Sequence, residues 1–432
     1  MFKKGREAVV MSLRFITAAS TIGTLIEWYD FFAYASVSPY ISAKFFPKGD
    51  PIVASLLTWL IFATAYVVRP LGAVLFGHLG DRVGRKATFL ATLTLMGLST
   101  FAIGLLPTYE QVGVLAPFLL ALFRILQGIS LGGEYGGALT YVLEHAPPNR
   151  RAFYAGFLSA TPPAGLALSS LTLVSTSLLL SRADIEAWGW RVPFLFSIVL
   201  TILGVYLRLR LTETPLFEAV KREGKVAKVP VVEAFTKYSK WIVVGVVISA
   251  GHAVLAYTST GYIFTYLTQV AKLDPLTVNL VVGVAALLQY PFYIINAWLA
   301  DKYGRKRIYM AGLALGLLTY YPIYQWLGTA RGLAETIFAV FILIYATAFT
   351  FSVLGTAIAE LFPTRVRYTG MSLTFNIGVG VFGGFTPTVV QLIGISLQNP
   401  LAGLILYTYV VAALALVVAY FYLPETAAKR LE

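Results

Sequence analysis

Runs of about twenty apolar residues, each bounded by charged residues, Pro or Gly, recur along the whole chain and match the length that an α-helix needs to cross a bilayer. Only 12% of the 432 residues are charged and 58% are hydrophobic, so a soluble fold would lack a polar coat. We therefore predict an all-α membrane protein with twelve transmembrane helices. Their expected ranges are 17–42, 53–77, 87–107, 114–142, 152–180, 190–209, 240–268, 277–299, 308–328, 335–358, 370–396 and 401–423.

The N-terminal residues are similar to a secretory signal peptide, because Lys3, Lys4 and Arg6 precede an apolar stretch. That stretch continues to Ile41. It is longer than a signal-peptide core and long enough to span a membrane. We predict that it is retained as the first transmembrane helix.

The distribution of Lys and Arg predicts the orientation of the chain. Of the 33 basic residues, 25 lie in the two termini and in the segments 81–86, 144–151, 208–240, 301–307 and 359–368, which all face one side. The loops on the other side hold six, namely Lys44, Lys48, Arg182, Arg191, Lys272 and Arg331. Because cytoplasmic loops carry the basic excess, we expect both termini in the cytoplasm and the chain in the inner membrane. The net charge of +13 then meets lipid headgroups rather than nucleic acid.

Three short signatures recur in the same order at about half the chain length, which indicates an internal repeat. The pairs are the segments 81–86 and 301–306, the residues Glu144 and Glu360, and the Glu-Thr pairs at 213–214 and 425–426. Each copy holds six expected spans, so both copies keep the same orientation. We predict two six-helix bundles related by a pseudo-two-fold axis along the membrane normal, over 1–210 and 240–432. The polar segment 211–239 is expected to be a cytoplasmic linker with helical pieces, and a central site should lie between the halves.

The charged loop after the second span, repeated after the eighth, is a candidate gate. An acid at a helix end can accept hydrogen bonds from a neighbouring helix N-terminus or pair with Arg, and such a contact can form in one conformation and break in another. The alternative is a basic membrane anchor with a tight Gly turn. The candidate gating residues are Gly77, Asp81, Arg82, Gly84, Arg85, Lys86, Glu144, Asp301, Gly304, Arg305, Glu360 and Arg365.

Five charged residues fall clearly inside expected spans: Glu27, Asp30, Arg69, Arg124 and Glu134. A charge at the bilayer centre costs roughly 2.5–3.5 kcal/mol on insertion scales, so these side chains should face a watery cavity or one another. Glu27 and Asp30 lie three residues apart on one helical face. Buried acids in this arrangement are candidates for carrying the transported proton. The alternative is permanent pairing of the acids with Arg69 or Arg124, because three acids against two Arg sum to −1.

Arg69 and Arg124 also offer fixed positive charge and a fork geometry that suits a carboxylate, which favours an anionic or zwitterionic substrate. His252 is the one His inside a span, and Tyr residues of the first and seventh spans could line a cavity. A hydrogen-bonded structural His and a lipid-interface Tyr belt are the alternatives. The candidate substrate-binding residues are Arg69, Arg124, Tyr34, Gln127, His252, Tyr257 and Tyr262.

Small residues and Pro predict close and bent helices. Gly128, Gly132 and Gly136 share one face of the fourth span, and a similar row occupies 376–384 in the eleventh. Such rows allow close helix approach. Pro162 and its neighbour Pro163 remove backbone donors inside the fifth span, so we expect it to bend there.

Several longer motifs accompany these residues. They are Glu27-Trp28-Tyr29-Asp30-Phe31, Arg69-Pro70-Leu71-Gly72, Arg124-x-x-Gln127-Gly128-x-x-x-Gly132-Gly133-Glu134-Tyr135-Gly136, Trp188-Gly189-Trp190-Arg191-x-Pro193-Phe194 and Glu360-Leu361-Phe362-Pro363-Thr364-Arg365-Val366-Arg367. Together with the repeated charged loop, nearly the whole chain resembles the metabolite:proton symporter family of the major facilitator superfamily. The resemblance implies alternating access and proton symport of citrate, 2-oxoglutarate, shikimate, proline or betaine. It also implies a proton-coupling role for Arg124, beside Glu27, Asp30 and Glu134.

We expect a proton-coupled symporter that imports a small organic acid or a zwitterionic metabolite. A proton-independent facilitator or exporter of the same fold is the alternative, and a membrane-embedded enzyme or transport-like sensor is the alternative from another class. The chain has no Cys, no His-Glu-x-x-His run and no phosphate-cradling loop. The run 378–383 matches a dinucleotide fingerprint but has no preceding strand. We therefore expect no enzyme activity, metal or cofactor, a proton gradient as the energy source, and a lipid-embedded monomer.

Overall fold

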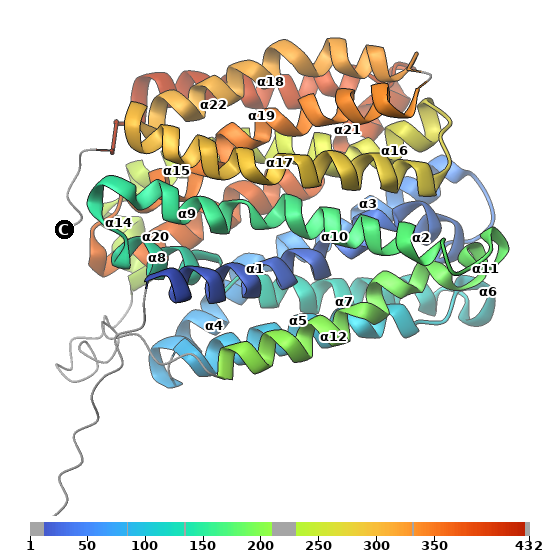
Figure 1. Ribbon diagram of the computed structural model, residues 1–432, viewed down its shortest axis with the longest axis horizontal. Coiled ribbons are helices and arrows are strands. Elements are labelled where there is room, and N and C mark those ends of the chain that lie inside the picture. The colour runs from blue at the N-terminus through green and yellow to red at the C-terminus, as the bar shows by residue number, and fades with distance from the viewer. Residues whose placement is uncertain (1–12, 84, 134, 210–229, 331, 428–432) are drawn as a thin grey trace, which may run out of the picture.

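The computed structural model describes residues 13–83, 85–133, 135–209, 230–330 and 332–427 (Figure 1). For residues 14, 15, 77–83, 85–89, 141, 144, 230, 364, 365 and 368, only the helical backbone is described. The described chain is almost wholly helical, and no strand occurs within it.

The N-terminal half holds the helices of the first six expected spans and two short helices, α6 and α11, between them. They are α1 (Leu13–Ser36), α2 (Ser38–Lys44), α3 (Pro51–Val67), α4 (Arg69–Val83), α5 (Arg85–Leu105), α6 (Tyr109–Val112), α7 (Leu115–Leu131), α8 (Tyr135–His145), α9 (Arg151–Ser159), α10 (Thr161–Thr176), α11 (Arg182–Ala187) and α12 (Val192–Leu209). Short 3₁₀ turns, η1 (Pro148–Arg150) and η2 (Gly189–Arg191), precede α9 and α12.

The C-terminal half follows the same plan. It comprises α14 (Pro230–Lys237), α15 (Ser239–Tyr257), η3 (Thr258–Tyr262), α16 (Ile263–Thr265), η4 (Tyr266–Val270), α17 (Pro275–Tyr303), α18 (Arg305–Leu327), α19 (Leu333–Ala359), α20 (Thr364–Ile377), η5 (Gly378–Gly383), α21 (Gly384–Ser396), η6 (Leu404–Tyr409) and α22 (Val410–Tyr422). Four of these, η3, η4, η5 and η6, are π-helical turns. The helix α14 lies in the expected linker, so that segment does contain a helical piece.

All twelve expected spans correspond to helices, and several are interrupted where Pro restricts the backbone. The first breaks before Pro39 and the second before Pro70, while the predicted bend of the fifth lies at Ala160, between α9 and α10. Pro lacks an N–H and disfavours helical geometry in the preceding residue. Each break divides one crossing into two helical segments.

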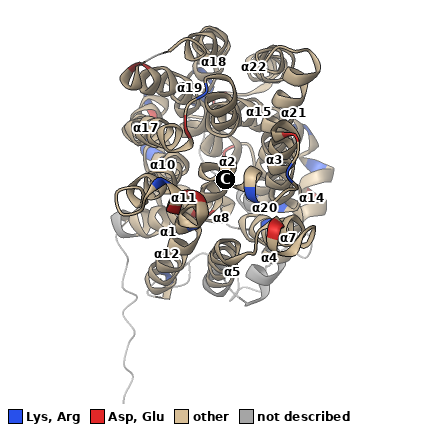
Figure 2. Cartoon of the chain, turned by 90° about the vertical axis from the view of Figure 1, so that its right-hand side faces the viewer, with Lys and Arg blue, Asp and Glu red and all other residues tan. Residues whose placement is uncertain are grey.

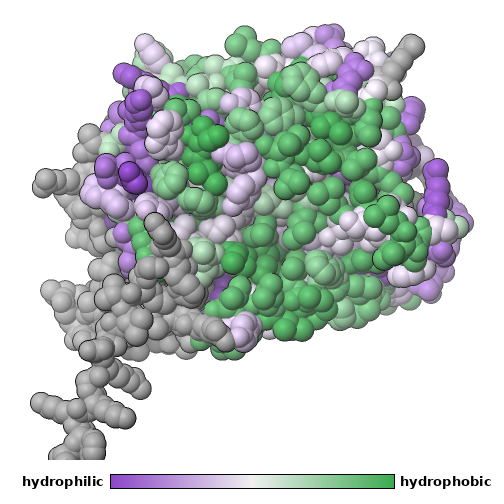
Figure 3. Space-filling view, in the orientation of Figure 1, coloured by the Kyte–Doolittle hydropathy of each residue, from purple (hydrophilic) through white to green (hydrophobic). Residues whose placement is uncertain are grey.

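The surface has the distribution of polarity expected for a bilayer. Figure 3 shows hydrophobic residues over the middle of the molecule and hydrophilic residues towards its two ends. Nine described segments are long and apolar enough to cross a membrane, and Leu90–Leu105 of α5 is a shorter apolar helix. The helices α1 and α18 coincide with the two remaining expected spans. Large apolar side chains such as Phe118 and Leu318 are more than 60% exposed, as expected for side chains that face the hydrocarbon of lipid. The protein is therefore a multi-pass membrane protein.

The helices run between two ends of the molecule. The start of α1 and the helix α14 lie at the left in Figure 1, and α6 and α11 lie at the right. We call the left end the termini face and the right end the opposite face. Viewed along the helices in Figure 2, α15, α18, α19 and α22 form an upper group, and α1, α5, α7 and α12 form a lower group.

The start of α3 and the start of α17 are alike, which adds a repeat signature that the sequence analysis missed. Asp50 accepts a hydrogen bond from the Ile52 N–H at 2.8 Å, and Pro51 follows it. Asp274 accepts from the Leu276 N–H at 3.0 Å, and Pro275 follows it. An Asp cap with Pro at the first helical position satisfies the exposed N–H groups of a helix start.

The halves meet along two seams. In the first, α9 and α10 pack against α17. In the second, α3, α4 and α8 pack against α20, η5 and α21. A side-chain carbon at Gly156 would lie 2.6 Å from the Ala297 Cβ, and one at Gly380 would lie 2.9 Å from the Tyr66 carbonyl oxygen. The seams therefore rely on close contact between small residues, as the glycine rows predict.

Candidate functional site

A small cavity lies between the two halves, near the middle of the molecule. Its volume is about 40 Å³, enough for about one or two water molecules. Its lining residues are Trp28, Phe32, Pro162, Pro163, Leu166, His252, Ala256, Tyr257, Thr260, Tyr293, Thr347, Phe351, Phe375 and Val379. We call it the central cavity. In this conformation it is too small to hold a metabolite.

Aromatic rings dominate this lining, and no Asp, Glu, Lys or Arg of the described chain belongs to it. Trp28 and Phe32 stack with their centroids 5.6 Å apart. His252 stacks on Phe351 at 4.7 Å. Such rings provide negative faces for a cation and apolar walls for methyl or methylene groups.

Two of the predicted substrate residues, His252 and Tyr257, line the central cavity. Two others lie outside it. The Tyr34 hydroxyl donates to the Thr58 carbonyl oxygen at 2.8 Å, and the Tyr262 hydroxyl donates to the Pro400 carbonyl oxygen at 3.1 Å.

Arg124 is fully buried on α7 and reaches Gln127, one turn later. Its Nη1 donates to Gln127 Oε1 at 2.7 Å, and Gln127 Nε2 donates to Thr100 Oγ1 at 2.7 Å. The guanidinium also lies over the rings of Tyr34 and Phe62, 4.6 and 4.8 Å from their centroids. Its Nε has no hydrogen-bond partner in the described chain, so one donor is left for another ligand.

Arg69 lies at the start of α4, where the second crossing breaks. Its guanidinium carbon is 4.0 Å from the Tyr66 ring centroid and 6.0 Å from that of Trp28. Nε and Nη2 have no hydrogen-bond partner among the described residues. Because Trp28 itself lines the central cavity, Arg69 lies one aromatic layer behind it.

The partner of Glu27 is Arg208, which the sequence analysis assigned to a basic cytoplasmic segment. Arg208 lies in the last turn of α12 and is buried, and its Nη2 is 2.9 Å from Glu27 Oε1. Adding Arg208 to the five charged residues that the sequence puts inside spans changes their formal sum from −1 to 0. Glu27 therefore pairs with neither Arg69 nor Arg124.

Asp30 differs from Glu27 although it lies on the same helix. It is completely buried, and neither carboxyl oxygen has a hydrogen-bond partner in the described chain. An unpaired carboxylate is costly in such a place. Asp30 is thus the acid whose charge the described surroundings compensate least.

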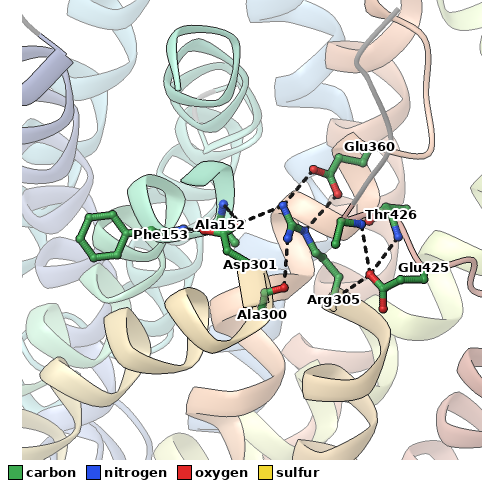
Figure 4. A network of polar contacts seen from close by, with 9 residues as sticks. Ala152, Phe153, Ala300, Asp301, Arg305, Glu360, Glu425 and Thr426 are labelled. Carbon is green, nitrogen blue, oxygen red and sulfur yellow. Dashed lines mark hydrogen bonds and ion pairs between the residues drawn. The ribbon is translucent and has the colours of Figure 1, made fainter. Parts of the chain in front are cut away.

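At the termini face, Asp301 connects the two halves (Figure 4). It lies on α17, and its carboxylate accepts from the backbone N–H groups of Ala152 and Phe153 on α9, at 3.1 and 2.8 Å. Arg305 Nη2 lies 3.0 Å from the same carboxylate. An acid at a helix N-terminus is favourable, so this contact holds the first seam closed.

Arg305 also joins the C-terminal half together. Its Nε is 3.3 Å from Glu360 Oε2, and its Nη1 donates to the Ala300 carbonyl oxygen at 3.0 Å. Burial raises the pKa of the Glu360 carboxyl, and the Arg305 charge opposes that effect. The network therefore brings Asp301, Arg305 and Glu360 together, as the repeat suggested.

Glu425 completes this network, and the sequence analysis did not count it as a gating residue. Its Oε1 accepts from the Arg305 N–H at 2.8 Å and from the Thr426 N–H at 3.0 Å. Gly304, at φ +104, lets the chain turn between α17 and α18, and a side chain there would collide with the Glu425 carboxylate. The positive φ is what favours Gly at this position, and any larger residue would also oblige the Glu425 carboxylate to move.

The other candidate gating positions cannot be placed in this way. Gly84 and Glu134 lie outside the described residues, as do the side chains at the remaining candidates. Those candidates are Gly77, Asp81, Arg82, Arg85, Lys86, Glu144 and Arg365. The backbones of α4 and α20 do lie in contact, which is where the repeat would put the counterpart of the Asp301 contact.

At the opposite face, a vestibule of about 300 Å³ lies between α2, α3 and η4. Ser38, Lys48, Trp59, Thr265 and Gln269 are among its lining residues. Trp59 Nε1 donates to Thr265 Oγ1 at 2.7 Å, which joins the halves at the wall of the vestibule. Trp59 in turn packs against Phe62, and Phe62 against Tyr257 of the central cavity. Aromatic rings therefore separate the vestibule from the central cavity.

Comparison with known proteins agrees with this architecture. The family described as "Sugar (and other) transporter" matches residues 15–229 and again 221–432, which fits the two halves. The inner membrane metabolite transport protein YhjE of Escherichia coli is 40% identical, with 84% of this chain and 83% of that protein covered. A Staphylococcus haemolyticus protein named as a proline/betaine transporter is 36% identical, over 90% of this chain and 83% of its own.

The fold is also found among solved structures. The crystal structure of a D-xylose-proton symporter has a TM-score of 0.75 with 17% identity, covering 98% of this chain and 100% of that one. At this identity the likeness concerns the fold alone. It confirms the prediction of two helical bundles.

Proposed function

This chain belongs to the sugar (and other) transporter family of the major facilitator superfamily, and from that membership we propose that it imports a small zwitterionic or organic-acid metabolite together with protons. Members of this family are transporters and not enzymes. Two observations carry the proposal: a central cavity lies between the two halves, and the N-terminal half holds a buried acid, Asp30, that has no hydrogen-bond partner among the described residues. A monomer in the lipid bilayer suffices for this function.

Alternating access requires contacts that can close each end in turn. The Asp301 contact with α9 would close the termini face, and the Trp59–Thr265 hydrogen bond would close the opposite face. The basic excess on segments of the termini face favours a cytoplasmic location for it. The present conformation would then be an occluded one, with its vestibule directed outward.

Asp30 would carry the transported proton. A neutral acid is tolerated in a dry site far better than an unpaired carboxylate, so proton binding would let the loaded carrier reorient. Release towards the cytoplasm would require water or a cation to reach Asp30. Arg69 and Arg124, whose free donors lie in the same half, are candidates for that cation, and no cofactor is needed because the proton gradient supplies the energy.

The aromatic lining favours a zwitterion with a cationic end. A cation over an aromatic face gains roughly 0.5–2 kcal/mol, and the central cavity offers several such faces. The relative named as a proline/betaine transporter supports this choice. An organic acid is the second candidate, because the unpartnered donors of Arg69 and Arg124 would suit a carboxylate.

Uptake into proteoliposomes tests the proposal. With radiolabelled proline, betaine and a panel of di- and tricarboxylates, at least one compound should accumulate above its external concentration under an inward proton gradient. A protonophore should abolish the accumulation. Equal uptake with and without the gradient would identify a facilitator instead.

Asp30→Asn tests the coupling residue. The variant should lose gradient-driven accumulation but keep exchange of labelled for unlabelled substrate, because exchange needs no net proton movement. Asp184→Asn, which alters an exposed acid at the opposite face, should accumulate substrate normally. Normal accumulation by Asp30→Asn would remove Asp30 from the coupling role.

A further inference from the structure

His252 is a polar group of the central cavity that the proton-coupling scheme does not use. It lies on α15, is only 6% exposed and stacks on Phe351. Its Nδ1 is 2.7 Å from Thr350 Oγ1 on α19. No described residue gives Nε2 a polar partner, although the ring lines the central cavity. One nitrogen of the imidazole is thus used by the protein and the other is left for a ligand.

The contacts of Thr350 favour one tautomer of His252. Thr350 Oγ1 lies 3.1 Å from the Thr347 carbonyl oxygen, to which it can only donate, and a hydroxyl has only one proton to donate. When that proton is used on the carbonyl, the same oxygen can only accept from His252. Nδ1 then carries the hydrogen, and Nε2 presents a lone pair.

We propose that His252 Nε2 recognises the substrate by accepting a hydrogen bond from an N–H or O–H group, and that Thr350 is the positioning residue that fixes this tautomer. The proposal rests on the function proposed above and narrows its substrate class. A zwitterion whose ammonium keeps an N–H would bind better than its fully methylated analogue. The surrounding aromatic rings suit the N–H-bearing ammonium and the fully methylated one equally. His252 Nε2 would therefore be the group that distinguishes them.

The lining offers His252 no acid that would hold an imidazolium. The hydroxyl-bearing lining residues are Tyr257, Thr260, Tyr293 and Thr347, and all of them are neutral. Tyr293 is engaged with Thr347 at 3.1 Å. A neutral imidazole with a fixed acceptor is what this arrangement supports, rather than a cationic site for carboxylate.

The tautomer can be observed directly. The chain has only three His residues, so a ¹⁵N-histidine spectrum of the full-length protein in nanodiscs is simple, and His252→Gln assigns the signals. We expect a protonated Nδ1 and an unprotonated Nε2. Thr350→Val should give a mixture of tautomers, and the matched Thr350→Ser should retain the wild-type spectrum. A protonated Nε2 or an imidazolium in the wild-type protein at neutral pH would overturn the proposal.

Binding measurements test the recognition itself. Calorimetry with proline, N-methylproline and N,N-dimethylproline removes the N–H donors stepwise while ring and carboxylate remain. Loss of the last donor should weaken binding roughly tenfold, or about 1.4 kcal/mol, because the hydrogen bond to Nε2 is no longer made. Thr350→Val should reduce this discrimination, Thr350→Ser should keep it, and His252→Ala should abolish it.

The outcomes separate this inference from the proposed function. Equal binding of proline and its dimethyl analogue by the wild-type protein would reject the role of His252 and leave transport untouched. Binding of organic acids alone, with no zwitterion bound, would reject the zwitterion class and with it this role. A tenfold preference that survives in His252→Ala would assign the discrimination to another group.

Discussion

Arg208 and Glu27 form a buried ion pair, with Arg208 Nη2 2.9 Å from Glu27 Oε1, that ties α12 to α1. Their positions differ by 181 in the sequence. Removal of one partner leaves a buried charge, which costs about 3–5 kcal/mol, whereas replacing both by apolar residues is often neutral.

We therefore expect Glu27→Leu and Arg208→Met each to lower the melting temperature in detergent strongly, and the double variant to recover most of the loss. The measurement is a double-mutant cycle of unfolding midpoints. Additive losses would show that the pair has no coupling and that each residue is held by other contacts. Arg182→Met, which removes half of an exposed pair with Glu186, is the control and should change little.

Asp301→Asn should weaken the cap on α9 and favour opening at the termini face. The absence of native Cys makes a single Ala256→Cys, in the lining of the central cavity, a clean reporter. Labelling by a membrane-impermeant maleimide from the termini side should become several-fold faster in Asp301→Asn. Lys302→Gln, beside it but exposed, should leave the rate unchanged, and an unchanged rate in Asp301→Asn would argue against a latch.

Trp59→Phe should have the reverse effect at the other end. The ring is kept, but the indole N–H that binds Thr265 at 2.7 Å is lost. Labelling of the same Ala256→Cys reporter from the opposite face should accelerate, and Thr265→Val should reproduce the change. Trp188→Phe, at a half-exposed Trp, serves as the control. Slower labelling in Trp59→Phe would contradict a closing role for this bond.

Gly156→Ala should destabilise the first seam, because its new Cβ would lie 2.6 Å from the Ala297 Cβ. Overpacking of this kind costs about 1–3 kcal/mol. The swap Gly156→Ala with Ala297→Gly should restore the melting temperature, since it removes the opposing carbon. Gly49→Ala, where the nearest atom is 4.0 Å away, should be tolerated. Failure of the swap to recover stability would mean that backbone strain rather than this contact is responsible.

Glu110 at the opposite face offers a pH-dependent contact. The hydrogen bond and charge of Lys48, 2.8 Å away, lower the pKa of this exposed carboxyl below its usual 4.5. The contribution of the pair is therefore present above the ordinary Glu pKa and is lost as the pH falls through the lowered one. Lys48→Met should raise the Glu110 pKa towards 4.5 in a carbon-detected NMR titration, and an unchanged pKa would show that the pair does not form in solution.

Much of the fold could be predicted because hydrocarbon imposes a length and a composition on every crossing. The twelve apolar runs and the repeated Asp301 motif depend on local sequence, so they were visible. Arg208 was not, because a basic residue near the end of a span looks like any cytoplasmic anchor, and only packing brings it to Glu27. The same applies to Thr350, whose relation to His252 arises from two distant helices.

The candidate site was predicted in part. His252 and Tyr257 line the central cavity, but its aromatic lining, with Trp28, Phe351 and Phe375, was not identified. Aromatic residues are common throughout this chain, and periodicity cannot tell a lipid-facing ring from one between the halves. Arg69 and Arg124 lie behind rings rather than in the cavity, a distinction that depends on side-chain packing and not on depth.

The π-helical turns make the two halves mechanically unequal although they share one topology. Each such turn holds one residue more than an α-helical turn does, and all those in the described chain belong to the C-terminal half, at η3, η4, η5 and η6. When the position of such a turn shifts along a helix, the part of the helix beyond it rotates about the helix axis. The backbone hydrogen bonds re-form in the new register. Torsional adjustment of this kind is thus available on one side of the cavity, beside Tyr257 and Val379, while the described helices of the other side contain no π-helical turn.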